Sequence, residues 1–547
     1  MAQDMMRKER GRAVSLEYVP SASEVKGQRG NRLDIHPAYY LFRSTDDGGF
    51  VLVSGEESLG GVLGYSAQGS VNVDDMPVAL QSLLERHTAN VEAYREGVVP
   101  APEQADASKL NYHVVEPFLT SRWSQRSPYN NFCPEVGAKH CLVGCVATAM
   151  AQILYYYRSP IQPQGTVTWD TENYRIGELT VDMSQFTLDF DKMADVVTNS
   201  SSQETRDAVA QLSYLCGAAS RMQYGTSSSG AFDEDGMLGL RTHFGFSASL
   251  LRVDYRDFYA TQEEWEQVIL DEIMEHRPVQ MGGISADGSG GDGAGHSFLL
   301  DGIDNNAFVH VNWGWGGEFD AFYTISLLNP SNYQFSLDQT VILGIQPAEE
   351  GEKVRQDILY ADSLYVKYTG MRDNLTRRSS FDMDLGCLFS SSIYPHTWQI
   401  GLGLFDRSGN LIGNVCVEQE ADMTFDFEPE GGYHIDEVSC QLPVDIPEGD
   451  YTLRAITREK GYEEWVETSA VGGAAKNRYP VLVTENSIRL GQVSSDMVSA
   501  RLNPEKSPVL HYDLQGRALD GRPHKGFSIQ VTRRSDGTSE TYKTFVK

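Results

Sequence analysis

The chain has 547 residues, 40% of them hydrophobic and 10% aromatic, and a chain of this length is expected to form about three or four domains. Its 45 lysines and arginines against 76 aspartates and glutamates give a net charge of −31. Such a charge repels nucleic-acid phosphates and anionic membrane surfaces, so it argues against both as partners.

Neither a transmembrane helix nor a signal peptide is evident in the sequence. No apolar run approaches the length of about 18 residues that a membrane span needs. The N-terminus MAQDMMRKERGRAVSL has basic residues but no apolar core for a signal peptide. We therefore expect a chain that either stays in the cytoplasm or begins after a removed signal.

The first hundred residues predict short strands followed by one helix. Residues 48–55 and 62–71 are typical of strands separated by glycine-rich turns, and 74–97 has apolar residues at helical spacing. Residues 98–109 are rich in proline, alanine and small polar residues. This segment is predicted to be an exposed linker that proteases can cut.

The middle of the chain predicts helices first and a sheet afterwards. The helices are expected over 145–158, 206–222 and 261–277, and the strands over 296–304, 307–315 and 321–328. Consecutive strands joined by short turns favour antiparallel pairing, so we expect an α+β domain.

Beyond residue 350 the sequence predicts β-structure only. Short strands between turn signals are typical of a β-sandwich, and residues 509–547 indicate a small separate β-unit. We therefore divide the chain into four domains, over residues 1–112, 113–348, 349–495 and 496–547.

Residues 139–157, KHCLVGCVATAMAQILYYY, raise the question of what their two cysteines do. Cys145 follows Gly144 and opens a predicted helix, where first-turn N–H groups and the helix dipole favour a thiolate. The same N–H groups can hold an oxyanion. Cys145 is therefore a candidate nucleophile, although a buried structural cysteine is the common alternative.

A cysteine nucleophile needs a base, and His296 is the histidine best placed to be one. It stands between a loop in which seven of the fourteen residues 282–295 are glycine and a predicted strand. Such a loop lets backbone approach a substrate closely. His296 lies 151 positions after Cys145, about the separation found in papain-type enzymes.

Two further segments could complete such a site. In papain-type sites an Asn orients the histidine and a Trp shields their hydrogen bond from water, and Asn312 and Trp313 follow His296 in that order. Neighbours on a strand face opposite ways, so which of the two supports His296 stays open. Gln125, upstream of the cysteine, could donate an N–H to the oxyanion.

Together these segments resemble the streptopain family of secreted bacterial cysteine peptidases, which have a papain-like core. The resemblance rests on the motifs WSQRSPYN, GCVATAMAQ, QYGTSSSG, GHSFLLDG and HVNWGWGG, which occur in the family order over roughly 115–347. Residues 38–71 resemble the family's inhibitory prodomain. The C-terminal extension is similar to those of larger members of the interpain and periodontain type from Bacteroidetes, and the tail resembles sorting-type modules of that phylum.

The resemblance implies a fold class, an activity and a set of site residues. It implies an α+β protein with a prodomain, a papain-like peptidase domain, an Ig-like β-sandwich and a small sorting-type module. It implies Cys145 as nucleophile, His296 as base and acid, Gln125 in the oxyanion hole, and support from Asn312 or Trp313. The residues expected to line the substrate cleft are Gly295, Ser227, Ser228, Ser229 and Trp315.

The resemblance also implies partners and a location. We expect a secreted or cell-surface endopeptidase made as a zymogen, inhibited by its own prodomain and activated by cleavage within roughly 98–118. Its expected substrates are host or nutrient proteins and peptides, and neither a cofactor nor a metal is expected.

Other functions stay open at this point. A Cys–His enzyme of the transglutaminase or amidase type would use the same dyad, and a non-catalytic adhesin would act through the β-rich C-terminal third. The spacing of Cys133, His140, Cys141 and Cys145 fits no paired C-x2-C zinc pattern. A disulfide between Cys133 and Cys141 remains open.

Overall fold

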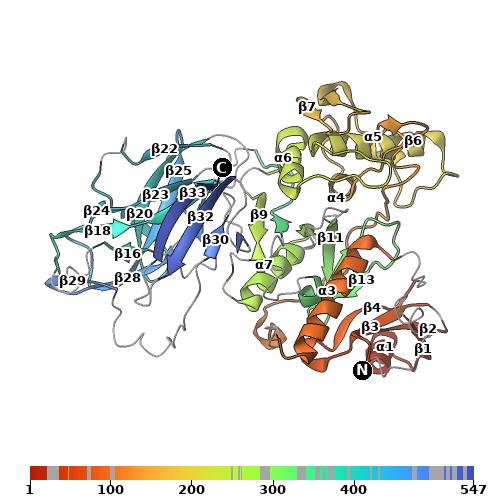
Figure 1. Ribbon diagram of the computed structural model, residues 1–547, viewed down its shortest axis with the longest axis horizontal. Coiled ribbons are helices and arrows are strands. Elements are labelled where there is room, and N and C mark those ends of the chain that lie inside the picture. Colours follow the sequence, from red (N-terminus) through yellow and green to blue (C-terminus); the bar gives the residue numbers. More distant parts are fainter. Residues whose placement is uncertain are drawn as a thin grey trace. The chain divides into compact units, whose positions relative to one another are not determined.

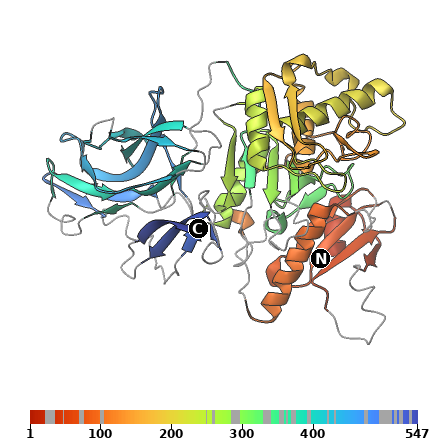
Figure 2. The same cartoon turned by 45° about the horizontal axis from the view of Figure 1, so that its top comes forward.

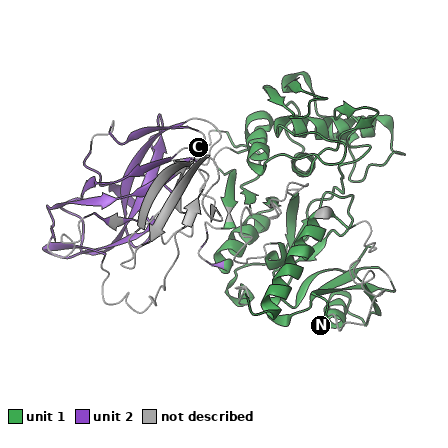
Figure 3. Ribbon diagram, viewed as in Figure 1, with its two compact units in different colours: residues 1–256, 262–354 green, residues 257–261, 355–547 purple. Residues whose placement is uncertain are grey.

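The structure is a computed structural model that divides into two compact units, coloured separately in Figure 3. Unit 1 is Met1–Arg256 with Gln262–Val354, and unit 2 is Asp257–Thr261 with Arg355–Lys547. The residues that the structure describes are 1–20, 36–46, 48–69, 76–98, 105–247, 250–256, 259, 261–283, 296–328, 340–350, 358–360, 364–367, 375–390, 396–418, 422–428, 432–470, 477–491, 510–512, 518–519, 526–533 and 539–546.

Unit 1 begins with a small α+β segment. Its elements are α1 (Ala2–Arg10), β1 (Leu16–Val19), β2 (Tyr39–Ser44), β3 (Phe50–Ser54), β4 (Val62–Ser66) and α3 (Val78–Arg95). Helix α3 buries Leu80, Leu83, Leu84, His87 and Val91, a spacing of three and four residues that places them on one face. Figures 1 and 2 show α3, in orange, against the sheet, where it contacts β2, β11 and α8.

The helices in the middle of unit 1 pack around α4 (Cys145–Tyr157), which contacts α5 (Gln203–Ala219) and α6 (Asp233–Phe244). Every residue of α4 from Val146 to Tyr155 is buried. Alanines at 147, 149 and 151 leave room for the neighbouring elements to approach closely. Two hairpins lie beside these helices: β5 (Glu135–Val136) with β6 (Lys139–His140), and β7 (Thr166–Asp170) with β8 (Glu178–Asp182).

A ten-stranded antiparallel sheet joins the N-terminal segment to the rest of unit 1, in the order β1-β2-β3-β4-β13-β12-β11-β10-β14-β9. The strands not yet given are β9 (Arg252–Tyr255), β10 (Val279–Gly283), β11 (His296–Ile303), β12 (Val309–Asn312), β13 (Ala321–Tyr323) and β14 (Thr340–Leu343), with helices α7 (Gln262–Met274) and α8 (Ile325–Leu328). At the junction, Gly64 of β4 pairs with Tyr323 of β13.

The predicted order of helices followed by an antiparallel sheet is confirmed, with differences in detail. The predicted strand over 321–328 is wrong beyond Tyr323, because the chain turns there into the short helix α8. Strands β9, β10 and β14 and helix α6 were not predicted. Strand β10 lies beside β11 and buries Gln280 completely, so its sequence lacks the plain alternation that identifies a half-exposed strand.

Unit 2 is a β-sandwich. Its largest sheet has the order β17-β29-β28-β25-β20-β21, with β22 and β26 pairing on β20 and β25, and two further sheets have the orders β16-β18-β24 and β23-β19-β15-β27. Trp398 and Leu453 from the first sheet share one apolar core with Phe381 and Leu388 from the other two. Packing of sheets over a shared core defines the sandwich.

The strands of the sandwich are β15 (Ile358–Tyr360), β16 (Tyr365–Val366), β17 (Leu375–Thr376), β18 (Ser380–Asp384), β19 (Gly386–Ser390), β20 (His396–Phe405), β21 (Leu411–Asn414), β22 (Thr424–Phe427), β23 (Gly432–Ile435), β24 (Val438–Gln441), β25 (Gly449–Glu459), β26 (Val466–Glu467), β27 (Ser469–Ala470), β28 (Tyr479–Val483) and β29 (Ser487–Leu490). Only β15 and β27 pair in parallel among those described.

The C-terminal tail forms a further antiparallel sheet of the order β31-β30-β32-β33. Its strands are β30 (Leu510–Tyr512), β31 (Ala518–Leu519), β32 (Gly526–Arg533) and β33 (Ser539–Val546). The four domain boundaries predicted from the sequence stay predictions. Within the part of the chain that the structure describes, no helix is long and apolar enough to span a membrane.

The β4–β13 junction gives a testable prediction through Gly64. A Cβ at this position would lie 2.3 Å from Cδ1 of Tyr323, so Gly64→Ala forces the two strands apart at a cost of about 1–3 kcal/mol. We expect faster hydrogen exchange at the Thr324 amide, which donates to Leu63 O at 2.9 Å. The control is Gly61→Ala, whose Cβ would meet only the end of the Met1 side chain. Equal exchange in both variants would contradict the assigned junction.

Candidate active site

The turn before α4 places Cys145 at the first position of the helix. Gly144 has φ 90°, a conformation that L side chains rarely adopt. A Cβ at Gly144 would also lie 2.5 Å from Sδ of Met222. The backbone angle favours glycine at 144, and any side chain there would also displace the end of the Met222 side chain.

The sulfur of Cys145 lies among backbone N–H groups and close to one carboxyl group. Burial raises the pKa of the Cys145 thiol, and the carboxylate of Asp233 raises it further. The backbone N–H groups of Ser297, Val146 and Cys145 itself act in the opposite direction, because they donate to the sulfur. The net result is a pKa above the ordinary value, so the thiol is protonated at neutral pH in this form of the chain.

His296 is the first residue of β11 and lies half-buried, with the neighbouring Ser297 against Cys145. Burial lowers the pKa of His296 to about 4, and the positive charge of Arg86 contributes to this lowering. Its Nε2 is buried without a hydrogen-bond partner among the described residues. The imidazole is therefore neutral at neutral pH.

The fold brings the start of α4 against the start of β11. The residue next to His296 donates its N–H to Cys145, and successive side chains of a strand point to opposite faces. Leu299 shares the apolar core around α4, so Ser297 and Leu299 face α4 and His296 faces away from it. The groups that act on the imidazole come from the other side, from Arg86 of α3.

Asn312 is buried at the end of β12 in a hydrogen-bond network that does not include His296. Its Nδ2 donates to Ser121 O at 2.7 Å and to Gln152 Oε1 at 3.2 Å, and its Oδ1 accepts from Gln152 Nε2 and from the Gly314 N–H. Gln152 belongs to α4, so Asn312 ties the sheet to this helix.

Trp313 lies on the side of β11 that carries His296. Its indole packs against Phe298 with ring centroids 4.7 Å apart, and Phe298 is two residues from His296 along the strand, hence on the same face. Its Nε1 donates to Phe319 O at 3.0 Å and its backbone N–H to Asp320 at 3.0 Å. Trp313 is therefore fixed in position by contacts with β11 and with the turn at residues 319–320.

Gln125 and Trp315 lie on segments that run beside the start of α4. The backbone O of Gln125 accepts from Val143 N–H at 3.1 Å, two residues before Cys145. The turn that carries the half-buried Trp315 is joined to the Gln125 segment, because Gly316 N–H donates to Trp123 O at 2.9 Å. Both predicted site residues therefore lie on the Cys145 side of the sheet.

Of the other residues predicted to line the cleft, only Ser229 is buried. Its hydroxyl exchanges hydrogen bonds with the backbone of Gly225, whose O accepts from Leu142 N–H at 2.9 Å. This holds the loop beside the segment that leads to Cys145. Ser227 and Ser228 are exposed on the same loop, whereas Gly295 lies outside the described residues.

Two charged residues near the dyad were not predicted from the sequence. Asp233 begins α6 and accepts from Thr340 Oγ1 at 2.9 Å and from Gln280 Nε2 at 3.3 Å. Burial raises the pKa of Asp233 to about 6. It is therefore a carboxylate at neutral pH, close enough to Cys145 to oppose ionisation of the thiol.

Arg86 is the second such residue and comes from α3. Its Nε and Nη1 are buried without hydrogen-bond partners among the described residues, and burial lowers the pKa of the guanidinium. Among the described residues no carboxylate is paired with this half-buried guanidinium, and such a cation is unusual. The sequence signal for Arg86 was a charged residue within the predicted amphipathic helix. The sequence alone does not show which side of the helix this residue faces.

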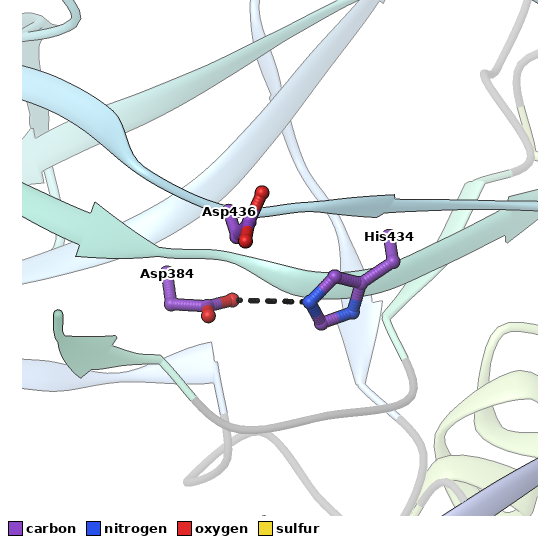
Figure 4. A group of neighbouring side chains, drawn as sticks. All are labelled: Asp384, His434 and Asp436. Carbon is purple, nitrogen blue, oxygen red and sulfur yellow. Dashed lines mark ion pairs between the residues drawn. The ribbon is translucent and has the colours of Figure 1, made fainter. Parts of the chain in front are cut away.

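One group of residues with metal-ligand chemistry lies in unit 2. Asp384, His434 and Asp436 offer ligand atoms within 4.8 Å of one another, and Figure 4 shows the three side chains. The ammonium of Lys367 lies 2.9 Å from Asp436 and 4.0 Å from Asp384. Because Lys367 already forms ion pairs with both carboxylates, we describe the group as an ion-pair cluster.

Two known protein families match separate stretches of this chain. The Peptidase C10 family matches residues 123–323, and the Spi protease inhibitor family matches residues 5–91. The first range contains α4 and β11, and the second contains the part of α3 that carries Arg86.

Known relatives cover both ranges. Streptopain of Streptococcus pyogenes is 29% identical over 325 residues, which are 55% of this chain and 79% of that protein. The thiol protease/hemagglutinin PrtT of Porphyromonas gingivalis is 29% identical over 334 residues, 57% of this chain and 37% of that protein. The solved fragment of Prevotella intermedia prointerpain A is 30% identical with a TM-score of 0.52, over 62% of this chain and all of the fragment. The chain therefore belongs to the peptidase C10 family and is a cysteine-type peptidase of the streptopain and interpain kind, with an inhibitor-like N-terminal segment ahead of its catalytic part.

Proposed function

We propose that this chain is the zymogen of a secreted cysteine endopeptidase that hydrolyses host or nutrient proteins through Cys145 and His296. The observation that carries the proposal is the contact between the start of α4 and the start of β11, where the Ser297 N–H meets the Cys145 sulfur. This contact puts a thiol at a helix N-terminus within one residue of a histidine. Such a pair is the minimum that thiol-based acyl transfer requires.

The proposed reaction begins with attack of the Cys145 thiolate on the peptide carbonyl. The oxyanion accepts hydrogen bonds from the Cys145 N–H and from the side chain of Gln125, whose backbone is held beside the helix start by Val143. His296 takes the thiol proton and gives it to the leaving amine. Water, deprotonated by His296, then hydrolyses the acyl-enzyme.

Trp313 and Asn312 have different proposed tasks. Trp313 packs on Phe298 and shields the His296 face of β11 from water. Asn312 is a positioning residue, because its amide is engaged by Gln152 of α4 and holds the helix to the sheet. Trp315, Ser227, Ser228 and Ser229 are proposed to line the substrate cleft, together with Gly295.

The N-terminal segment is proposed to keep the enzyme latent by holding His296 away from Cys145. Helix α3 contacts β11, and its Arg86 disfavours the imidazolium that a thiolate–imidazolium pair needs. Release of α3 would remove this charge and return His296 to water. Cleavage is proposed within 98–118, where the described residues 106–109 are exposed.

The proposal keeps the predicted domains at 1–112, 113–348, 349–495 and 496–547 as inhibitor, peptidase, sandwich and small C-terminal module. Secretion fits the net charge of −31, which favours solubility. A transferase or amidase would use the same dyad, so product analysis with an added amine decides between the reactions. Hydrolysis gives a free carboxylate, and transfer gives a new amide.

Replacement of the proposed nucleophile tests the activity itself. Cys145→Ala is expected to lower peptide hydrolysis by about 10³-fold or more, because no other group replaces the thiolate. The variant should also stay full-length while the wild type shortens over time. The control is Cys141→Ala, which removes a buried thiol at 0% exposure near the site. If Cys145→Ala shortened at the wild-type rate, self-processing would be excluded.

Acid is expected to speed release of the N-terminal segment. The pKa of His296 is about 4 while α3 lies against β11, and its ordinary value is 6.5. Between pH 4 and pH 6.5, the form from which α3 has been released therefore binds more protons at His296. Docking therefore weakens as the pH falls from about 6.5 towards 4. The measurement is the rate of self-processing at pH 5 and pH 7, or cleavage of the Cys145→Ala chain by a trace of active enzyme.

Variants of Arg86 test the source of this pH dependence. Arg86→Gln removes the charge that disfavours imidazolium, so the ratio of the rates at pH 5 and pH 7 should fall towards one. It should not reach one, because burial is the larger cause of the lowered pKa. Arg86→Lys keeps the charge and should keep the ratio. Equal ratios in Arg86→Gln and wild type would show that Arg86 does not act on His296.

Asp233 gives a prediction for the thiol. Asp233→Asn removes the carboxylate that raises the pKa of Cys145, so alkylation of Cys145 in the full chain should begin at lower pH. The control is Asp235→Asn, two residues along the same helix and paired with Arg221 at 3.9 Å. Peptide mapping after timed exposure to iodoacetamide measures both. If the pH dependence of Cys145 alkylation were the same in Asp233→Asn and wild type, Asp233 would have no effect on the Cys145 thiol.

A further inference from the structure

Two cysteines of unit 2 lie opposite each other where the edges of two sheets meet. Strand β21 ends the large sheet and β24 ends the sheet β16-β18-β24. Just beyond β21, Cys416 forms a single antiparallel bridge with Cys440 of β24. This bridge joins the two sheets of the sandwich through their backbones.

The hydrogen bonds around the bridge identify its type. The Val417 N–H donates to Ser439 O and the Gln441 N–H donates to Val415 O, each at 2.9 Å. These bonds flank the cysteines, so Cys416 and Cys440 form a non-hydrogen-bonded pair, in which Cα atoms are about 4.5 Å apart and side chains are close. A disulfide needs Cα atoms about 4.4–6.8 Å apart. The backbone therefore meets this requirement without moving.

The side chains are close as well, as is usual for a non-hydrogen-bonded pair, and Cys416 raises the pKa of the Cys440 thiol. The Leu402 N–H donates to Cys416 Sγ at 3.2 Å, and the Cys440 thiol donates to Val438 O at 3.4 Å. Cys440 is completely buried, whereas Cys416 is half-buried. Cys416 is thus the sulfur that an oxidant in solution reaches first.

The other close pair of cysteines lacks this alignment. The Cys141 N–H donates to Pro134 O at 2.8 Å, which sets Cys141 opposite Pro134 and leaves Cys133 one residue out of register. In the same sandwich, Cys387 Sγ lies 3.7 Å from Nδ1 of His434, so its neighbour is a histidine.

We propose that Cys416 and Cys440 form a redox-active pair that closes to a disulfide and fastens the two sheets of the sandwich together. The oxidant is a disulfide of the glutathione or dithiol-oxidoreductase class. The Cys416 thiolate attacks it, forms a mixed disulfide and releases one thiol. The Cys440 sulfur then attacks Cys416 Sγ and releases the second thiol. Two protons and two electrons leave the protein, and the oxidant's disulfide becomes two thiols.

The bond would close a loop from 416 to 440 that contains β22 and β23. Closing a loop of this size restricts the unfolded chain, which raises the stability of the folded sandwich. Oxidising compartments outside the cytoplasm favour the closed form, and reducing ones the open form. The link is independent of the peptidase chemistry, since none of its residues belongs to the dyad.

The test uses the full chain carrying Cys145→Ala, which cannot react through its active-site thiol. After equilibration with oxidised glutathione, alkylation and peptide mapping should yield one peptide pair joined through Cys416 and Cys440, lost again on reduction. The thermal transition of the sandwich should rise by about 5–10 °C on oxidation. This chain keeps both Cys416 and Cys440. The peptide mapping therefore does not depend on whether a variant of either cysteine folds.

Variants of Cys416 and Cys440 test whether these two residues cause the joined peptide and the higher transition temperature. Cys416→Ser, and separately Cys440→Ala, should remove both the joined peptide and the rise in transition temperature. Cys387→Ser, in the same domain, should keep both. Separate alkylation of Cys416 and Cys440 after oxidation, or glutathione held on Cys416 without closure, would overturn the proposal. A joined peptide in Cys416→Ser that contains Cys440 with another cysteine would overturn it as well.

Discussion

The start of α4 can lie against the start of β11 only because residue 144 has no side chain. Gly144 takes a φ of 90°, and a Cβ there would collide with Met222. With this turn in place, the helix presents its first residue, Cys145, to the Ser297 N–H. The small residues that follow let the rest of α4 pack into the core. The position of Cys145 at the start of the helix and its approach to the Ser297 N–H both follow from this one turn.

The same packing disfavours the charged forms of both Cys145 and His296. Burial and Asp233 hold the pKa of Cys145 above its ordinary value, while burial and Arg86 hold that of His296 at about 4. A neutral thiol and a neutral imidazole are the less reactive members of the dyad. The helix dipole and the N–H groups favour the thiolate, but they act against burial of the thiol. The protonation states of the two groups therefore lower their reactivity in this form, in addition to the proposed separation of His296 from Cys145.

Much of the fold was readable from sequence because its patterns are local. Leu80, Leu83, Leu84 and Val91 repeat at helical spacing and lie on one buried face of α3. Gly144 before an alanine-rich run predicted the helix that begins at Cys145, and the observed helix begins there. The antiparallel arrangement of the strands after His296 was predicted from their short connections and is observed.

The parts that sequence did not predict depend on contacts between distant segments. The pairing of β4 with β13 makes one sheet of the N-terminal segment and the catalytic part, and neither strand's sequence specifies the other. Asp233 and Arg86 reach the dyad from positions 88 residues after Cys145 and 210 residues before His296, with no motif around either. The surroundings of Asn312 needed the structure too, because nothing in the sequence shows that its amide is bonded to Gln152.

The central claim is that docking of α3 lowers the basicity of His296. The most direct measurement is an NMR titration of the His296 ring in the Cys145→Ala chain, first intact and then after removal of the N-terminal segment. We predict a pKa of about 4 in the intact chain and a return to the ordinary range after removal. The same pKa in both forms would contradict the account.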